Sequence, residues 1–221
     1  MIDDVLSQVA PHLCCGCAKI GALICDNCKY DIISDVFSRC IACSKLASRT
    51  GICMQCSVPY ARAWCVGERS GVLQRLIDDF KFHNVSSAYI PLAEILIDRL
   101  DELPSNTIVV PVPTVAAHFR QRGYDHTLLL AAAVARARNL KMEQTITRAT
   151  STKQRDASRQ VRVVQAKVAF RVDRSIDPTV PYLIVDDIVT TGATIQYAAA
   201  ALQAADAEHI WVATIARQPL D

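Results

Sequence analysis

Residues 182–194 read YLIVDDIVTTGAT. The unbroken apolar run at the start is typical of a parallel strand that is buried on both faces. We expect this strand to end in two adjacent carboxylates, Asp186 and Asp187, and a short Thr/Gly turn to lead into a helix near Ala193. The backbone N–H groups and hydroxyls of such a turn, together with the helix N-terminus, form a site for an anion such as phosphate. Gly192 allows the backbone to approach that anion closely.

The two acids limit what the anion can be, because carboxylates beside a bare phosphate would repel it. They are explained if they accept hydrogen bonds from sugar hydroxyls while a divalent cation nearby neutralises the charge. A phosphorylated ribose fits both parts of this site, because its hydroxyls can donate to the acids and its phosphate can bind at the Thr/Gly turn. The alternative is a strand that ends in acids and is followed by a threonine that only caps a helix.

Strands and helices alternate along the chain on both sides of this stretch, which predicts an α/β fold with a mostly parallel sheet and helices on both faces. We predict strands at 62–69, 107–113, 145–149, 181–187 and 209–216. We predict helices at 70–82, 87–103, 124–140 and 193–205. In such sheets, ligands bind at the carboxyl ends of the strands.

Nine of the ten cysteines lie within residues 14–56, and only Cys65 lies beyond them. Eight of the nine form four C-x-x-C pairs, which are Cys14/Cys17, Cys25/Cys28, Cys40/Cys43 and Cys53/Cys56. Two such pairs complete a tetrahedral Cys₄ zinc site. Sequential grouping is the simplest arrangement, and a cross-braced grouping stays open. Cys15 belongs to no C-x-x-C pair, because it stands two positions before Cys17 and such a pair needs three.

The cysteine pairs predict two structural zinc sites, because a Cys₄ site leaves no position open for water or substrate. A disulfide framework would need an oxidising compartment, and an iron–sulfur cluster is the other alternative. We therefore predict a double zinc-ribbon domain over 1–60 and an α/β domain over 61–221. The first of these would dock a protein or cap the second domain rather than bind DNA.

The overall composition excludes several classes of protein. With 221 residues, 51% of them hydrophobic and 21% charged, the chain is not intrinsically disordered. It has no apolar run of about 18 residues, and acids stand where a signal peptide needs basic residues, so we expect a cytoplasmic protein without membrane insertion. The net charge is only +2. However, residues 148–174 hold eight basic residues against two acids, which predicts a basic lid, a nucleic-acid patch or a solvated helix face.

The 182–194 stretch resembles, at every position, the PRPP-binding signature of type I phosphoribosyltransferases, where PRPP is 5-phosphoribosyl 1-pyrophosphate. Combined with the cysteine pairs, it makes the chain similar over roughly residues 12–217 to the ComF/GntX family, in which a double zinc ribbon precedes a phosphoribosyltransferase domain. Segments 71–83 and 109–127 also resemble that family, as does the spacing of Gln154, Arg162 and Phe170. Members of the ComF group are associated with DNA uptake in natural transformation.

The resemblance implies a function for particular residues. Asp186 and Asp187 would be the catalytic acids that hold the ribose hydroxyls, and the following turn would hold the 5′-phosphate through Thr190, Thr191, Gly192, Ala193 and Thr194. A pyrophosphate loop would comprise Pro113, Thr114, Val115 and Ala116, with Arg120 and Arg122 nearby. A lid would carry Gln154, Arg155, Arg159 and Arg162. His118, His126 and Asp125 are candidates for acid–base work.

The implied reaction is displacement of pyrophosphate from C1 of PRPP by an acceptor, usually a nitrogen, with Mg²⁺ as cofactor and water excluded. The chain departs from the family around the expected acceptor pocket, because Arg122–His126 reads RGYDH where the family has RGFNQ, and Ala157 and Gln165 replace its Leu and Asn. The competing hypothesis is a module that binds single-stranded DNA or proteins of the DNA-uptake machinery and whose PRPP site senses a ligand or is vestigial.

Overall fold

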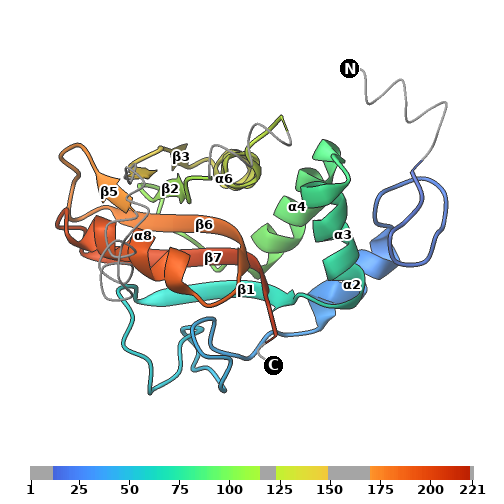
Figure 1. The fold of residues 1–221 in the computed structure, drawn as a ribbon, viewed down its shortest axis with the longest axis horizontal. Coiled ribbons are helices and arrows are strands. Elements are labelled where there is room, and N and C mark those ends of the chain that lie inside the picture. The colour runs from blue at the N-terminus through green and yellow to red at the C-terminus, as the bar shows by residue number, and fades with distance from the viewer. Residues whose placement is uncertain (1–11, 115–122, 149–169, 220–221) are drawn as a thin grey trace, which may run out of the picture.

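A computed structural model describes residues 12–114, 123–148 and 170–219 of the chain. Its centre is a five-stranded sheet in the order β1-β7-β6-β2-β3, in which every neighbouring pair is parallel. Figure 1 shows this sheet with helices on both sides. The strands are β1 (Arg62–Glu68), β2 (Ile108–Pro111), β3 (Lys141–Met142), β6 (Pro181–Val189) and β7 (His209–Arg217). The predicted α/β class with a mostly parallel sheet is confirmed.

Side chains of the central strand β6 alternate between two hydrophobic cores. Leu183 and Val185 belong to a core with the helices α3 (Gly71–Phe82), α4 (Tyr89–Arg99) and α6 (His126–Ala137). Tyr182 and Ile184 belong to the opposite core with α8 (Ala193–Gln203). Because both faces of the strand are covered, it is apolar without interruption until Asp186.

The cysteine-rich segment packs on the α/β part of the chain. Cys14, Ile24 and Cys28 share the core of α3 and α4, and Ile41 and Tyr60 share the core of α8. The segment contains one helix, α2 (Asp26–Ser34), and it covers the free edge of β1, where the backbone N–H of Ala63 donates to the carbonyl of Thr50 at 2.7 Å. The division into domains at residues 60 and 61 stays a prediction.

Some element boundaries differ from the sequence-based expectation. The predicted helix 87–103 is a 3₁₀ turn, η1 (Ser86–Ala88), followed by α4, which ends at Arg99 because Leu100 is extended. The predicted strand 145–149 is β4 (Ile146–Arg148), and it pairs antiparallel with β5 (Phe170–Val172) outside the main sheet. The two-residue β3 was not predicted. Among the described residues, no helix has the length and apolar character needed to span a membrane.

Candidate functional site

Asp186 and Asp187 lie near the carboxyl end of β6 and are almost completely buried, with 7% and 8% of their surface exposed. Local hydrogen bonds orient both carboxylates. Asp186 Oδ1 accepts from the N–H of Asp187 at 2.9 Å, and Asp187 Oδ1 accepts from the N–H of Ile188 at 2.6 Å. Two buried acids side by side need nearby positive charge, because unpaired buried charges are costly.

Lys81, near the end of α3, supplies part of that charge. Its Nζ atom lies 2.9 Å from Asp187 Oδ2, and both side chains are largely buried. Lys81 has no role that the sequence predicts, because it stands more than 100 residues before the acids in the chain. The only signal was its place in segment 71–83, which resembles a segment of the ComF/GntX family.

Arg148, at the end of β4, is the second cation at the site. Its Nε donates to the carbonyl of Pro113 at 2.9 Å, and its guanidinium lies 4.9 Å from the ring centroid of Phe170. Its positive charge also acts on Asp186. Arg148 therefore links the end of β2 to the end of β6, the two strand ends at which the sequence predicts ligand binding.

Burial raises the pKa of the Asp186 carboxyl to about 8, and the negative charge of Asp187 adds to this increase. The charges of Lys81 and Arg148 act in the opposite direction without cancelling it. The surroundings of Asp186 therefore favour its protonated form, and a cation or a hydroxyl donor that reaches the carboxyl would favour release of the proton.

The turn after β6 has the geometry expected of an anion site. Gly192 has a left-handed backbone with φ of 78° and stands at the N-cap of α8. The side chains of Thr190, Thr191 and Thr194 are exposed, and Thr191 Oγ1 accepts from the N–H of Ala193 at 3.4 Å. Hydroxyls and the N-terminus of an eleven-residue helix are thus available to an anion at one place.

The end of β2 is tied to the start of α6. Thr114 Oγ1 donates to Asp125 Oδ1 at 2.8 Å, and the same oxygen accepts from Thr127 Oγ1 at 2.8 Å and from the N–H of Leu128 at 3.1 Å. Asp125 is therefore engaged as the N-cap of α6. His126 is 1% exposed and packs edge-on against Phe80, with ring centroids 4.6 Å apart. These contacts favour structural roles for both candidates for acid–base work.

Several predicted site residues lie outside the described part of the chain. Pro113 and Thr114 of the predicted pyrophosphate loop are described, at the end of the strand beside β6. The remaining members of that loop and the predicted lid are not, namely Val115, Ala116, Arg120, Arg122, Gln154, Arg155, Arg159 and Arg162, together with His118. Their roles stay predictions.

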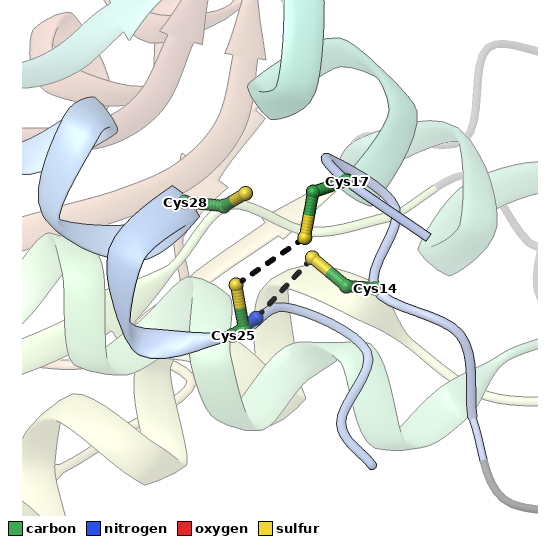
Figure 2. Close-up of side chains that lie close together, drawn as sticks. All are labelled: Cys14, Cys17, Cys25 and Cys28. Carbon is green, nitrogen blue, oxygen red and sulfur yellow. Dashed lines mark hydrogen bonds between the residues drawn. The ribbon is translucent and has the colours of Figure 1, made fainter. Parts of the chain in front are cut away.

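The eight paired cysteines form two groups, and in each group all four sulfurs lie within 4.8 Å of one another. The first group is Cys14, Cys17, Cys25 and Cys28, shown in Figure 2, and the second is Cys40, Cys43, Cys53 and Cys56. The grouping is sequential, so the cross-braced alternative is excluded. Cys15 belongs to neither group.

Backbone N–H groups prepare both clusters for a metal. The N–H groups of Gly16 and Cys25 donate to the sulfur of Cys14 at 3.4 and 3.3 Å. Burial raises the pKa of the Cys14 thiol, but the backbone N–H groups of Cys17, Cys25 and Gly16 together outweigh it and lower the pKa to about 6. The backbone of Gln55 likewise lowers the pKa of Cys53 to about 6. Thiolates are the form that binds Zn²⁺, so the donor sets fit that ion.

Comparison with known proteins agrees with this geometry. Residues 127–221 match the model of the phosphoribosyl transferase domain. The chain is 30% identical over 201 residues to a DNA utilization protein YhgH of Salmonella typhi, covering 84% of this chain and 88% of that protein. It is 29% identical over 216 residues to Competence protein F of Haemophilus influenzae, covering 90% and 92%. With two Cys₄ clusters preceding a phosphoribosyl transferase domain, the chain belongs to the ComF family.

Proposed function

We propose that the chain binds PRPP at the carboxyl end of β6 and transfers its ribose 5-phosphate to a nitrogen acceptor. The observation that supports this most directly is the buried pair Asp186–Asp187, followed within a few residues by the Gly192 turn at the start of α8. The acids are placed to accept hydrogen bonds from the ribose hydroxyls, and the turn to bind the 5′-phosphate. The match to a phosphoribosyl transferase domain supports the same assignment.

In the proposed reaction, the nitrogen lone pair forms a bond to C1 and the bond from C1 to the pyrophosphate oxygen breaks. The electron pair leaves with pyrophosphate, and the nitrogen loses a proton. The chain supplies no covalent nucleophile, so it acts by positioning and by charge. Arg148 is the described cation placed between the ends of β2 and β6, where the pyrophosphate would lie. Asp186 and Asp187 are the residues that would hold Mg²⁺, whose charge would offset that of the leaving pyrophosphate.

Lys81 forms an ion pair with Asp187. Its ammonium group compensates the acid pair until a sugar hydroxyl or a cation takes over part of the carboxylate. We therefore place Lys81 at the PRPP site as a residue that positions Asp187. Both clusters of four cysteines would hold structural Zn²⁺, because neither leaves a coordination position for a substrate.

Calorimetric titration of the zinc-loaded protein with PRPP and Mg²⁺ tests the binding site. We expect the double variant Asp186→Asn/Asp187→Asn to weaken PRPP binding by at least tenfold. Glu94→Gln is the control, because it also removes one acid from an ion pair, at a largely exposed position on α4. If the wild type gives no heat of binding, the proposed function is wrong. Release of pyrophosphate in the presence of trial acceptors then tests turnover.

A second candidate function is the binding of single-stranded DNA or of a protein of the DNA-uptake machinery. The names of the two relatives support it, as does the excess of basic residues in 148–174. Phosphate contacts make such binding salt-dependent. We expect simultaneous replacement of Arg155, Arg159 and Arg162 by alanine to weaken DNA binding and to reduce its salt dependence. Unchanged affinity would remove this segment from the hypothesis.

A further inference from the structure

The second cysteine cluster, which comprises Cys40, Cys43, Cys53 and Cys56, lies directly against the turn that begins α8. The knuckle between its first two cysteines is in contact with this turn, because a Cβ atom on Gly192 would lie 3.7 Å from the Cα atom of Ala42. The neighbouring Ile41 is 1% exposed and shares a core with Val189 and Ile195, which flank the turn on either side.

Arg217, the last residue of β7, holds the end of β6 that leads into the turn. It is 1% exposed and is the largest fully buried side chain in the described part of the chain. Its NH1 group donates to the carbonyl of Val189 at 3.1 Å and to the carbonyl of Gln218 at 3.2 Å. The N–H of Gln218 donates to the same Val189 carbonyl at 2.8 Å. Two donors therefore hold the residue immediately before Thr190.

Metal ligation explains how the second cluster can act on the turn. A Cys₄ site fixes four side chains around one ion, so an occupied second cluster holds the 40–43 knuckle in one conformation. Through Ile41, this knuckle packs with Val189 and Ile195 on either side of the turn, while the guanidinium of Arg217 holds the Val189 carbonyl.

The first cluster has no comparable connection among the described residues. Its knuckle packs against the beginning of α3, where the Nε of Arg75 donates to the carbonyl of Cys15 at 2.5 Å. Lys81 is six residues further along this helix, which corresponds to about 9 Å at the rise of an α-helix. The two clusters therefore differ in how closely they contact the proposed PRPP site.

We propose that Arg217 and the 40–43 knuckle are positioning elements for the turn of Thr190–Thr194, so that occupancy of the second cluster sets the affinity for the 5′-phosphate of PRPP. This inference rests on the proposed function and assigns a role to one zinc site that the other does not have. Loss of metal from the second cluster frees the 40–43 knuckle, which packs beside the turn, and so loosens the turn. Loss of metal from the first cluster lowers stability and leaves the turn in place.

A first experiment uses the wild-type, zinc-loaded protein. Cysteine alkylation is followed residue by residue by mass spectrometry, with and without PRPP and Mg²⁺. Because coupling between two sites is reciprocal, PRPP should slow modification of the second cluster at least threefold and leave the first unchanged. If PRPP binds by calorimetry and protects both clusters equally, or neither, this inference is wrong and the proposed function stands. If PRPP gives no heat, both are wrong.

A second experiment compares two arginines whose guanidinium groups donate to backbone carbonyls. Arg217→Met should weaken PRPP binding at least tenfold and accelerate alkylation of the second cluster. Arg138→Met is the matched control, because Arg138 also donates to two backbone carbonyls, of Ile97 at 2.8 Å and Leu100 at 2.9 Å, away from the turn. Arg138→Met should lower the melting temperature without weakening PRPP binding and without accelerating alkylation of the second cluster. If Arg217→Met does not fold, Arg217→Lys keeps the charge and should show the same two effects more weakly. Equal PRPP affinity in the Arg217 and Arg138 variants would overturn the proposal.

Discussion

Replacement of Lys81 by methionine tests whether this residue compensates the acid pair. The Lys81 Nζ atom lies 2.9 Å from Asp187 Oδ2, and the two side chains are 16% and 12% exposed. At an effective dielectric constant of about 20, two charges at this separation attract by about 6 kcal/mol before the cost of desolvation. Loss of one partner of a buried pair costs about 3–5 kcal/mol, because the other charge stays buried. We expect Lys81→Met to lower the free energy of unfolding by about 3 kcal/mol.

A double-mutant cycle with Asp187→Asn, measured by urea denaturation, isolates the interaction between the two side chains. We expect a coupling energy of about 2 kcal/mol, because the cycle excludes the penalty for the unpaired charge. The control is the cycle of Lys29→Met and Glu94→Gln, whose atoms lie at a similar distance of 2.8 Å, but with the Glu94 side chain 53% exposed. Exposed pairs contribute up to about 1 kcal/mol.

The comparison between the two cycles is the decisive measurement. Both pairs have nearly the same separation, so only burial and the neighbouring acid distinguish them. A coupling energy for Lys81 and Asp187 no larger than that for Lys29 and Glu94 would refute the assignment of Lys81 as the counter-charge of the site. An increase in stability on Lys81→Met would also refute it.

Three further predictions concern the acids, the zinc sites and the turn. The pKa of Asp186 is raised to about 8 in the folded chain, so folding takes up a proton between the unfolded and folded pKa values. The free energy of unfolding should therefore fall as pH rises from about 4 to 8. Urea denaturation at a series of pH values should show this fall in the wild type and a flatter curve in Asp186→Asn. Metal analysis should find two zinc ions per chain, reduced to one by Cys53→Ser and unchanged by the control Cys15→Ser. Gly192→Ala should lower the free energy of unfolding by about 1 kcal/mol, because φ is 78°, and should also weaken PRPP binding in calorimetry. The control Gly71→Ala, at a φ of 54°, should lower the free energy of unfolding and leave PRPP binding unchanged.

Much of the fold was predictable because its signals are local. The apolar run before Asp186 indicates a strand covered on both faces, and the spacing of apolar residues in 70–82 and 193–205 indicates helices that the structure contains as α3 and α8. The family and both cysteine clusters were also predictable, since a C-x-x-C pair sets two sulfurs in one turn. Short or irregular elements were not: β3 has two residues, and β4 pairs outside the main sheet.

The chemical groups of the site follow from the order of residues along the chain, because Asp186, Asp187 and the Gly192 turn belong to one strand–turn–helix unit whose geometry depends on local backbone preferences. Their charge balance does not, because it depends on side chains brought together by packing. Lys81 pairs with Asp187 from α3, the charge of Arg148 acts on Asp186 from β4, and Arg217 donates to the Val189 carbonyl from β7. Each of these interactions joins residues more than 25 positions apart in the chain, and no local pattern in the sequence specifies which side chains meet over that separation.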